Sequence, residues 1–151
     1  MRDDSLTLKN YAGQIDLKSK LERFVLQRKT SKAFTITTKI EFEPTAFEFA
    51  GLILNADKEN YIQAGVIEQD GELQIVQRIK AGAFHPLAHL RAIPGVEKIM
   101  KSTRFKGKKL YLRIEVKDPE TAYFSYSTDN ENWRELGWRF FGRGVTPDLG
   151  W

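Results

Sequence analysis

The chain has 151 residues, with 24 basic and 20 acidic side chains and no cysteine. This length suits a single domain, residues 1–151, built around one core. The absence of cysteine excludes a disulfide scaffold, a cysteine nucleophile and a thiolate metal site. The net charge of +4 is too mild to indicate, by itself, a protein that binds nucleic acid.

No apolar run reaches about 18 residues, the length that a membrane-spanning helix needs. The first residues also lack the apolar segment of a secretory signal. We therefore expect no membrane association and a cytoplasmic location, with the reservation that a domain excised from a larger protein would look the same.

Most of the chain alternates apolar and polar residues, which is the pattern of β-strands buried on one face. The alternation is clearest in Phe34–Phe42 and Leu110–Lys117. In chain order the expected strands are Leu6–Lys9, Phe24–Gln27, Phe34–Phe42, Phe49–Ala56, Tyr61–Glu68, Glu72–Lys80, Leu110–Lys117 and Ala122–Thr128. Helical periodicity is almost absent, and the sequence therefore predicts an all-β fold.

Short polar segments separate these strands. Asp70-Gly71 is typical of a type I′ hairpin turn, in which both central residues have positive φ. Asp57–Asn60, Asp118–Glu120 and Asp129–Asn132 are rich in residues that form Asx-turns. Strands joined by tight turns predict a two-sheet antiparallel β-sandwich of the jelly-roll type.

Two stretches break this pattern. Ala81–Lys108 contains glycines, prolines and both histidines, and we expect a long loop there with a short helix over Pro94–Met100. Its basic residues have only Phe105 among them, whereas nucleic-acid-binding surfaces interleave cations with several aromatic rings. The other stretch, Trp138–Trp151, is expected to be a C-terminal loop segment.

Carboxylates and histidines are the candidate catalytic and metal-binding groups. Glycan-cleaving enzymes need two acids that flank the scissile bond. Glu41, Glu43 and Glu115 stand among lysines, as on a solvated strand face, and so predict no catalytic residue. His85 and His89 are four residues apart, but a proline after His85 disfavours the helix on which both could bind one metal. No metal site is expected.

Polar and aromatic residues on the expected strands are candidates for sugar binding. The outward positions of Leu110–Lys117 are Tyr111, Arg113 and Glu115. If Tyr61 and Gln63 face the same way, they add a ring and an amide to a carbohydrate cleft. Exposed strand faces also hold such residues for their β-propensity alone, and that alternative stays open.

The segment Tyr126–Trp133 predicts a hairpin turn rather than a catalytic site. Asp129 is expected to accept hydrogen bonds from turn amides, and Trp133 to fold back over the hairpin.

Several segments, taken in this order, resemble the concanavalin A-like domain at the C-terminus of glycoside hydrolase family 43 β-xylosidases and arabinofuranosidases. They are also similar to free-standing domains of the same superfamily. The segments are Leu6–Leu8, Leu26–Arg28, Thr38–Thr45, Ala50–Leu54, Asn60–Val66, Tyr111–Glu115, Tyr126–Asp129 and Trp133. The resemblance extends from Leu6 to about Gly137.

The resemblance implies a two-sheet sandwich without catalytic acids of its own, which packs against a catalytic propeller. A loop near its C-terminal end closes one side of the substrate pocket, and in this sequence Phe140 or Phe141 would meet the sugar there. Family members commonly end with a further strand, and this chain stops at Trp151, where that strand should begin. A fragment, a strand supplied by a partner, or replacement by Arg139–Val145 would account for this.

The sequence therefore predicts a non-catalytic accessory domain of a glycoside hydrolase that acts on xylan- or arabinan-type glycans. A free-standing glycan-binding protein is the alternative, and an enzyme that uses Glu41 or Glu115 as acid or base is the third reading. The expected partners are carbohydrate and a catalytic domain in cis, without nucleic acid. No cofactor is expected; the resemblance allows a structural calcium ion, but the acidic turns are better explained as turns.

Overall fold

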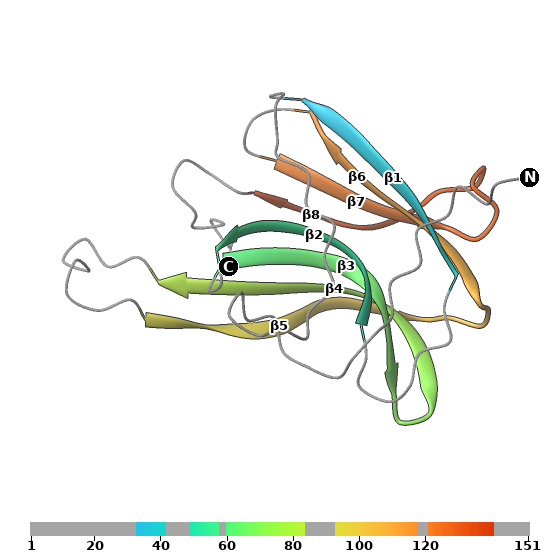
Figure 1. Cartoon of the computed structure of the whole chain (residues 1–151), viewed down its shortest axis with the longest axis horizontal. Helices are drawn as coiled ribbons and strands as arrows, with labels where there is room; N and C mark the ends of the chain where they lie inside the picture. The colour runs from blue at the N-terminus through green and yellow to red at the C-terminus, as the bar shows by residue number, and fades with distance from the viewer. Residues whose placement is uncertain (1–32, 42–48, 58–59, 84–92, 118–120, 141–151) are drawn as a thin grey trace, which may run out of the picture.

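The computed structural model describes residues 33–41, 49–57, 60–83, 93–117 and 121–140, without the side chains of residues 56, 57, 81, 83, 93, 94 and 138–140. All regular structure in these ranges is β-strand (Figure 1). The strands are β1 (Phe34–Glu41), β2 (Phe49–Asp57), β3 (Asn60–Gln69), β4 (Glu72–Ala83), β5 (Ile93–Arg104), β6 (Lys109–Val116), β7 (Thr121–Ser127) and β8 (Arg134–Phe140). None of the described residues belongs to a helix that could cross a membrane.

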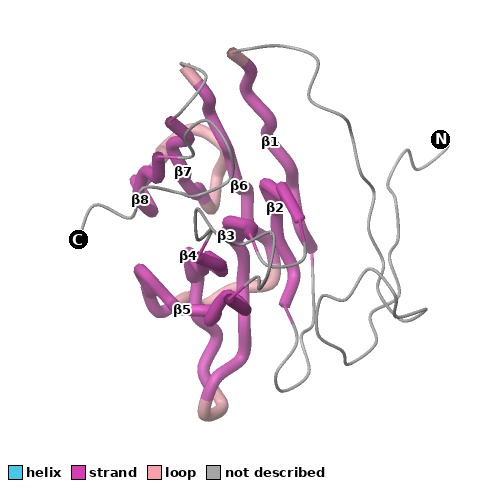
Figure 2. The backbone as a smooth tube through the Cα atoms, turned by 90° about the vertical axis from the view of Figure 1, so that its left-hand side faces the viewer, coloured by secondary structure: helices cyan, strands magenta, loops and turns pink. Residues whose placement is uncertain are grey.

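The strands form two four-stranded antiparallel sheets that lie face to face (Figures 1 and 2). Sheet A has the order β1-β6-β7-β8, and sheet B has the order β2-β3-β4-β5. The chain thus starts in sheet A, crosses to build all of sheet B, and returns for β6, which pairs with β1. The expected antiparallel β-sandwich is confirmed for the described residues.

The core lies between the sheets and follows from the period-two alternation. On β6, every second residue from Leu110 to Val116 is at most 1% exposed. The facing residues of sheet B are Ile62, Ala64, Val66, Ile75 and Ile79, and Phe124 and Leu136 complete the core from β7 and β8. The residues between these positions point to the outer face of each sheet.

The Asp70-Gly71 turn is confirmed. Asp70 has φ of 54° and Gly71 has φ of 77°, which is the positive pair that a type I′ hairpin turn requires. The turn joins β3 to β4 in uninterrupted register, from Gln69 opposite Glu72 to Tyr61 opposite Lys80.

The loop expected over Ala81–Lys108 is wrong for residues 81–83, which end β4, and for residues 93–104, which form β5. The short helix expected within it is therefore wrong as well. The apolar residues Val96, Ile99 and Met100 have the spacing of one helix face, yet they are 69%, 47% and 36% exposed. β5 is the edge of sheet B, and its register shifts between Lys101 and Ile99, so that Met100 is an extra residue. A bulge on an edge strand removes the alternation by which strands are recognised.

The C-terminal loop expected from Trp138 is also wrong at its start, because residues 138–140 belong to β8. β8 carries one clear core residue, Leu136, and its register with β7 shifts beside it. Gly137 follows with φ of 136°, and a Cβ there would lie 2.9 Å from the side-chain oxygen of the fully buried Gln77. A strand with this irregularity shows no period of two. The strands expected at Leu6–Lys9 and Phe24–Gln27, and residues 141–151, lie outside the described residues.

Candidate functional site

The structure divides the predicted sugar-binding residues between two opposite surfaces. Ile62 on β3 and Leu112 on β6 both point into the core between the sheets. Their neighbours Tyr61 and Gln63 therefore lie on the outer face of sheet B, whereas Tyr111 and its companions on β6 lie on the outer face of sheet A. Tyr61 and Gln63 therefore do not share a cleft with Tyr111, Arg113 and Glu115.

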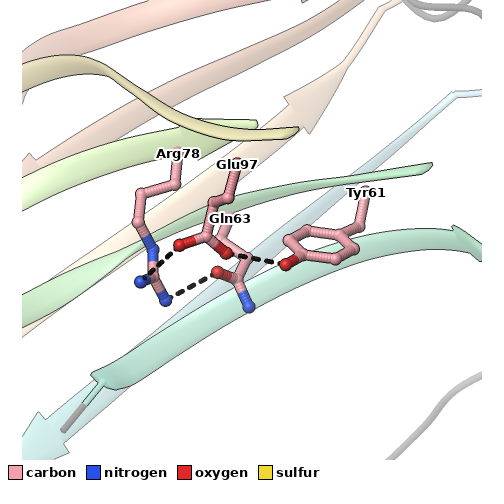
Figure 3. A network of polar contacts seen from close by, with 4 residues as sticks. All are labelled: Tyr61, Gln63, Arg78 and Glu97. Carbon is pink, nitrogen blue, oxygen red and sulfur yellow. Dashed lines mark hydrogen bonds and ion pairs between the residues drawn. The ribbon is translucent and has the colours of Figure 1, made fainter. Parts of the chain in front are cut away.

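On sheet B, Tyr61 and Gln63 join Arg78 and Glu97 in a polar network across β3, β4 and β5 (Figure 3). The Tyr61 hydroxyl donates to Glu97 Oε2 at 2.6 Å, and Arg78 Nη1 donates to Glu97 Oε1 at 2.9 Å. Arg78 Nη2 donates to Gln63 Oε1 at 2.8 Å. We call these four residues the closed network, because Tyr61 and Gln63 are only 6% and 1% exposed.

A layer of apolar contacts lies beneath this network. Gly51 and Gly65 are paired across β2 and β3, and a Cβ on either would come within 2.7 Å of the Phe49 ring. The guanidinium carbon of Arg78 lies 4.3 Å from the centre of that ring. The glycines therefore make room for an aromatic ring that supports the arginine. The Tyr61 ring, buried and hydrogen-bonded, is not an open platform for a sugar.

Arg78 and Glu97 belong to this network, but the sequence did not predict either of them as a site residue. Glu97 lies in β5, which has the pattern of a loop, and Arg78 stands opposite Gln63 only through the β3–β4 register. The Asp70-Gly71 turn sets that register. The pairing of Gln63 with Arg78 could have been predicted by counting residues back from this turn along both strands.

On sheet A, Tyr111, Arg113 and Glu115 do lie together on one outer face, as predicted. The β6–β7 register places Tyr123 opposite Glu115, and Tyr123 is 37% exposed. Trp133, the residue directly before β8, contacts the same surface, and the hairpin turn that precedes it was its signal in the sequence. We call these five residues the open face. Tyr123 was not singled out as a binding residue.

Arg113 occupies the centre of the open face. Its Nε donates to Thr37 Oγ1 at 3.2 Å, and its guanidinium carbon lies 3.6 Å from the centre of the Trp133 ring. One contact thus fixes the edge of the guanidinium and the other fixes its plane. A guanidinium held in this way is pre-organised for a planar acceptor.

Cations also flank the two tyrosines of the open face. Lys109 lies 5.8 Å from the centre of the Tyr111 ring, and Lys117 lies 5.0 Å from the centre of the Tyr123 ring. Lys117 also contacts the Glu115 carboxylate at 3.5 Å. These lysine contacts are partly exposed to solvent, so each contributes little to stability. The lysines nevertheless add positive charge to the surface.

The turn before β8 is held by Asp129, as predicted. Its Oδ1 accepts hydrogen bonds from the Ser127 hydroxyl and from the backbone amides of Glu131 and Asn132, at 2.7–2.8 Å. The Asn132 side-chain amide donates to Oδ2 at 2.7 Å. These donors, those of Asn132 foremost, hold the pKa of the Asp129 carboxyl well below its ordinary value. The carboxylate is engaged with turn donors, which explains this acidic segment as a turn.

The glutamates of the third reading lie far apart. Glu41 pairs with Lys109, six residues along β6 from Glu115, which corresponds to roughly 20 Å at the rise of a strand. Paired glycosidase carboxyls are about 5 to 9.5 Å apart. Glu41 forms an ion pair with Lys39. The two glutamates cannot act as one acid–base pair.

The remaining candidates lie largely outside the described part of the chain. His85, His89 and Phe141 are not described, and of Phe140 only the backbone is, opposite Thr121 at the end of β8. Within the described ranges, no three His, Cys, Asp or Glu residues come together as a metal-binding group.

Comparison with known proteins gives the family. A model for the β-xylosidase C-terminal concanavalin A-like domain of glycoside hydrolase family 43 matches residues 1–149, which confirms the resemblance. None of the curated proteins matches this sequence.

Solved structures share the fold. The family 43 protein BlXynB from Bacillus licheniformis is 18% identical, with a TM-score of 0.60, over 74% of this chain and 19% of that chain. A mutant of BlXynB has a TM-score of 0.61 at the same identity and coverage. A protein of unknown function from Saccharomyces cerevisiae is 15% identical, with a TM-score of 0.57, over 77% of this chain and 56% of that chain. This chain thus spans about a fifth of the bacterial enzyme's length.

Proposed function

Because this chain belongs to the family of β-xylosidase C-terminal concanavalin A-like domains, we propose that it is a non-catalytic domain that assists a glycoside hydrolase on xylan- or arabinan-type glycans. Its described residues hold no metal-binding group, and the Glu41 and Glu115 carboxylates are too far apart to work together. The matching family model describes a C-terminal domain of β-xylosidases, and on this ground we assign the chemistry to another module. The role of this domain is to hold the glycan near that module.

The open face is the observation that carries this proposal. Tyr111 pairs with Ser127, which is four residues along β7 from Tyr123, so the two tyrosines stand roughly 14 Å apart. That span accommodates more than one sugar ring. Arg113 lies between them and offers a donor for hydroxyl groups, and Glu115, beside Tyr123, offers an acceptor. The closed network, by contrast, offers its polar groups to one another.

Affinity electrophoresis in gels that contain xylan, arabinan or β-glucan tests this role. We expect retardation by xylan or arabinan, and a loss of most of it in the double variant Tyr111→Ala and Tyr123→Ala. Ile99→Ala is the matched control, because Ile99 is an exposed apolar residue on the other sheet. Unretarded migration in all three gels would contradict the proposal.

A free-standing glycan-binding protein would behave in the same way in these gels. The two roles differ when the full chain is added to a family 43 catalytic module. An accessory domain raises the rate of hydrolysis of polymeric glycan and leaves that of a small aryl glycoside unchanged. Binding without any effect on hydrolysis would favour the free-standing role.

A further inference from the structure

We infer that Arg113 recognises a carboxylate on the glycan, so that the open face selects uronate-bearing chains over neutral ones. This inference rests on the proposed function and names its substrate class. It does not follow from the family, since it depends on the surroundings of one guanidinium in this chain.

The first step is that the terminal nitrogens of Arg113 form no hydrogen bond within the described part of the chain. Its Nε is bound to Thr37 and its plane lies against Trp133, yet neither Nη atom has an acceptor among the described residues. Arg78 shows the alternative, because there Nη1 and Nη2 are bound to Glu97 and Gln63. Among the described residues, Arg113 therefore presents a fixed fork of donors without an acceptor.

The second step is the charge around this fork. The outer positions of β1 and β6, with Lys117 directly after β6, carry cations at Lys39, Lys109, Arg113 and Lys117, against the carboxylates of Glu41 and Glu115.

Both carboxylates contact a lysine, Glu41 with Lys39 and Glu115 with Lys117. The registers of β6–β7 and β7–β8 add the Glu135 carboxylate to the same face, two strands from Arg113. Glu135 offsets Lys109, so the positive charge of Arg113 itself favours an anion at the fork.

The third step is the shape of the ligand. A planar carboxylate accepts two parallel hydrogen bonds from a guanidinium fork, which no single hydroxyl can do. Tyr111 and Tyr123 flank the fork along the sheet and provide ring faces for neighbouring sugars. A carboxylate carried by a pyranose fits both features, whereas a small free anion would use only the fork.

Isothermal titration with matched polysaccharides tests this inference. The ligands are a xylan that carries glucuronic acid, the same xylan after reduction of its carboxyl groups to alcohols, and free glucuronate. We expect the native xylan to bind at least about tenfold more tightly than the reduced one, as the loss of a charge-assisted hydrogen bond implies. This preference should weaken as salt is added.

Two variants separate the effect of the bidentate hydrogen bonds from the effect of the positive charge. Arg113→Gln removes both, and Arg113→Lys keeps the charge but cannot form the bidentate pair. We expect both to lose the preference, with binding of the reduced xylan changed by less than about threefold. Arg104→Gln is the control for charge, because Arg104 is exposed on sheet B and paired with Glu72. It should retain the full preference. Unchanged urea unfolding midpoints show that each variant is folded.

The outcomes separate this inference from the proposed function. Equal binding of native and reduced xylan overturns the inference and leaves the proposed function intact. No binding of either xylan overturns the inference, and it overturns the proposed function as well if arabinan and β-glucan also fail to retard the protein. A full preference in Arg113→Lys overturns the bidentate fork, and free glucuronate that binds as tightly as the native xylan overturns the glycan as the occupant.

Discussion

The two outer faces of the sandwich carry the same residue types but differ in how these residues bind one another. Each has an arginine that contacts an aromatic ring and stands near a tyrosine and a glutamate. In the closed network the glutamate and a glutamine satisfy both terminal nitrogens of Arg78, and the tyrosine hydroxyl donates to that glutamate. On the open face the described residues give Arg113 a single side-chain acceptor, Thr37.

The difference shows that residue composition alone does not identify a binding site. Buried polar groups are usually hydrogen-bonded, and the closed network provides acceptors for both terminal nitrogens of Arg78, although its buried Nε has no partner among the described residues. On the open face no described residue occupies the terminal nitrogens of Arg113. Substitutions on either face test this difference.

The largest effect is expected beneath the closed network, from Gly65→Ala. A Cβ at Gly65 would lie 2.3 Å from the backbone oxygen of Ala50 and 2.6 Å from the Phe49 ring, so that β2 and the ring must move. We expect a loss of about 3 kcal/mol or more in unfolding free energy, measured with urea.

Gly71→Ala is the matched control. Nothing lies within 4 Å of a Cβ there, and only the φ of 77° penalises a side chain. It should cost about 1 kcal/mol. Equal losses at the two glycines would show that Phe49 and the strands move at little cost.

An intermediate effect is expected from replacing each arginine by methionine. Arg78→Met removes the donor to the buried Gln63 Oε1 and one of the two donors to Glu97, which keeps the Tyr61 hydroxyl, and should cost about 2 kcal/mol. Arg113→Met removes one partly exposed hydrogen bond and a contact with Trp133, and should cost less than about 1 kcal/mol. Urea unfolding of both variants tests the order, and its reversal would mean that Arg113 is the structural arginine.

The smallest effect is expected at the turn that positions Trp133. The pKa of Asp129 is lowered in the folded protein from an ordinary value of 3.8. Its contribution to stability is therefore complete above that value and is lost as the pH falls below it, through the folded pKa.

The measurement compares thermal unfolding of the wild type and Asp129→Asn between neutral and acidic pH. We expect the variant to be slightly less stable at neutral pH and the difference to shrink below about pH 4. A difference that stays constant with pH would show that the charge of Asp129 does not stabilise the turn.

Much of the fold was predictable, because local patterns set it. The alternation of β6 requires a strand with one buried face, and Asp70-Gly71 requires a tight turn with positive φ. The hydrogen bonds of Asp129 are equally local, since every donor lies within three residues of it. The family resemblance also rested on such segments.

The sequence by itself therefore determined the strands with clean alternation, their turns and the placement of Tyr111, Arg113 and Glu115 on one face. Only the tertiary structure decided that Tyr61 and Gln63 lie on the other sheet, enclosed by Arg78 and Glu97, and that the edge segment Ile93–Arg104 is a strand. The physical reason is that alternation specifies which side of a strand is buried. Which sheet holds the strand, and what stands beside it, is set by pairing between residues far apart in the chain.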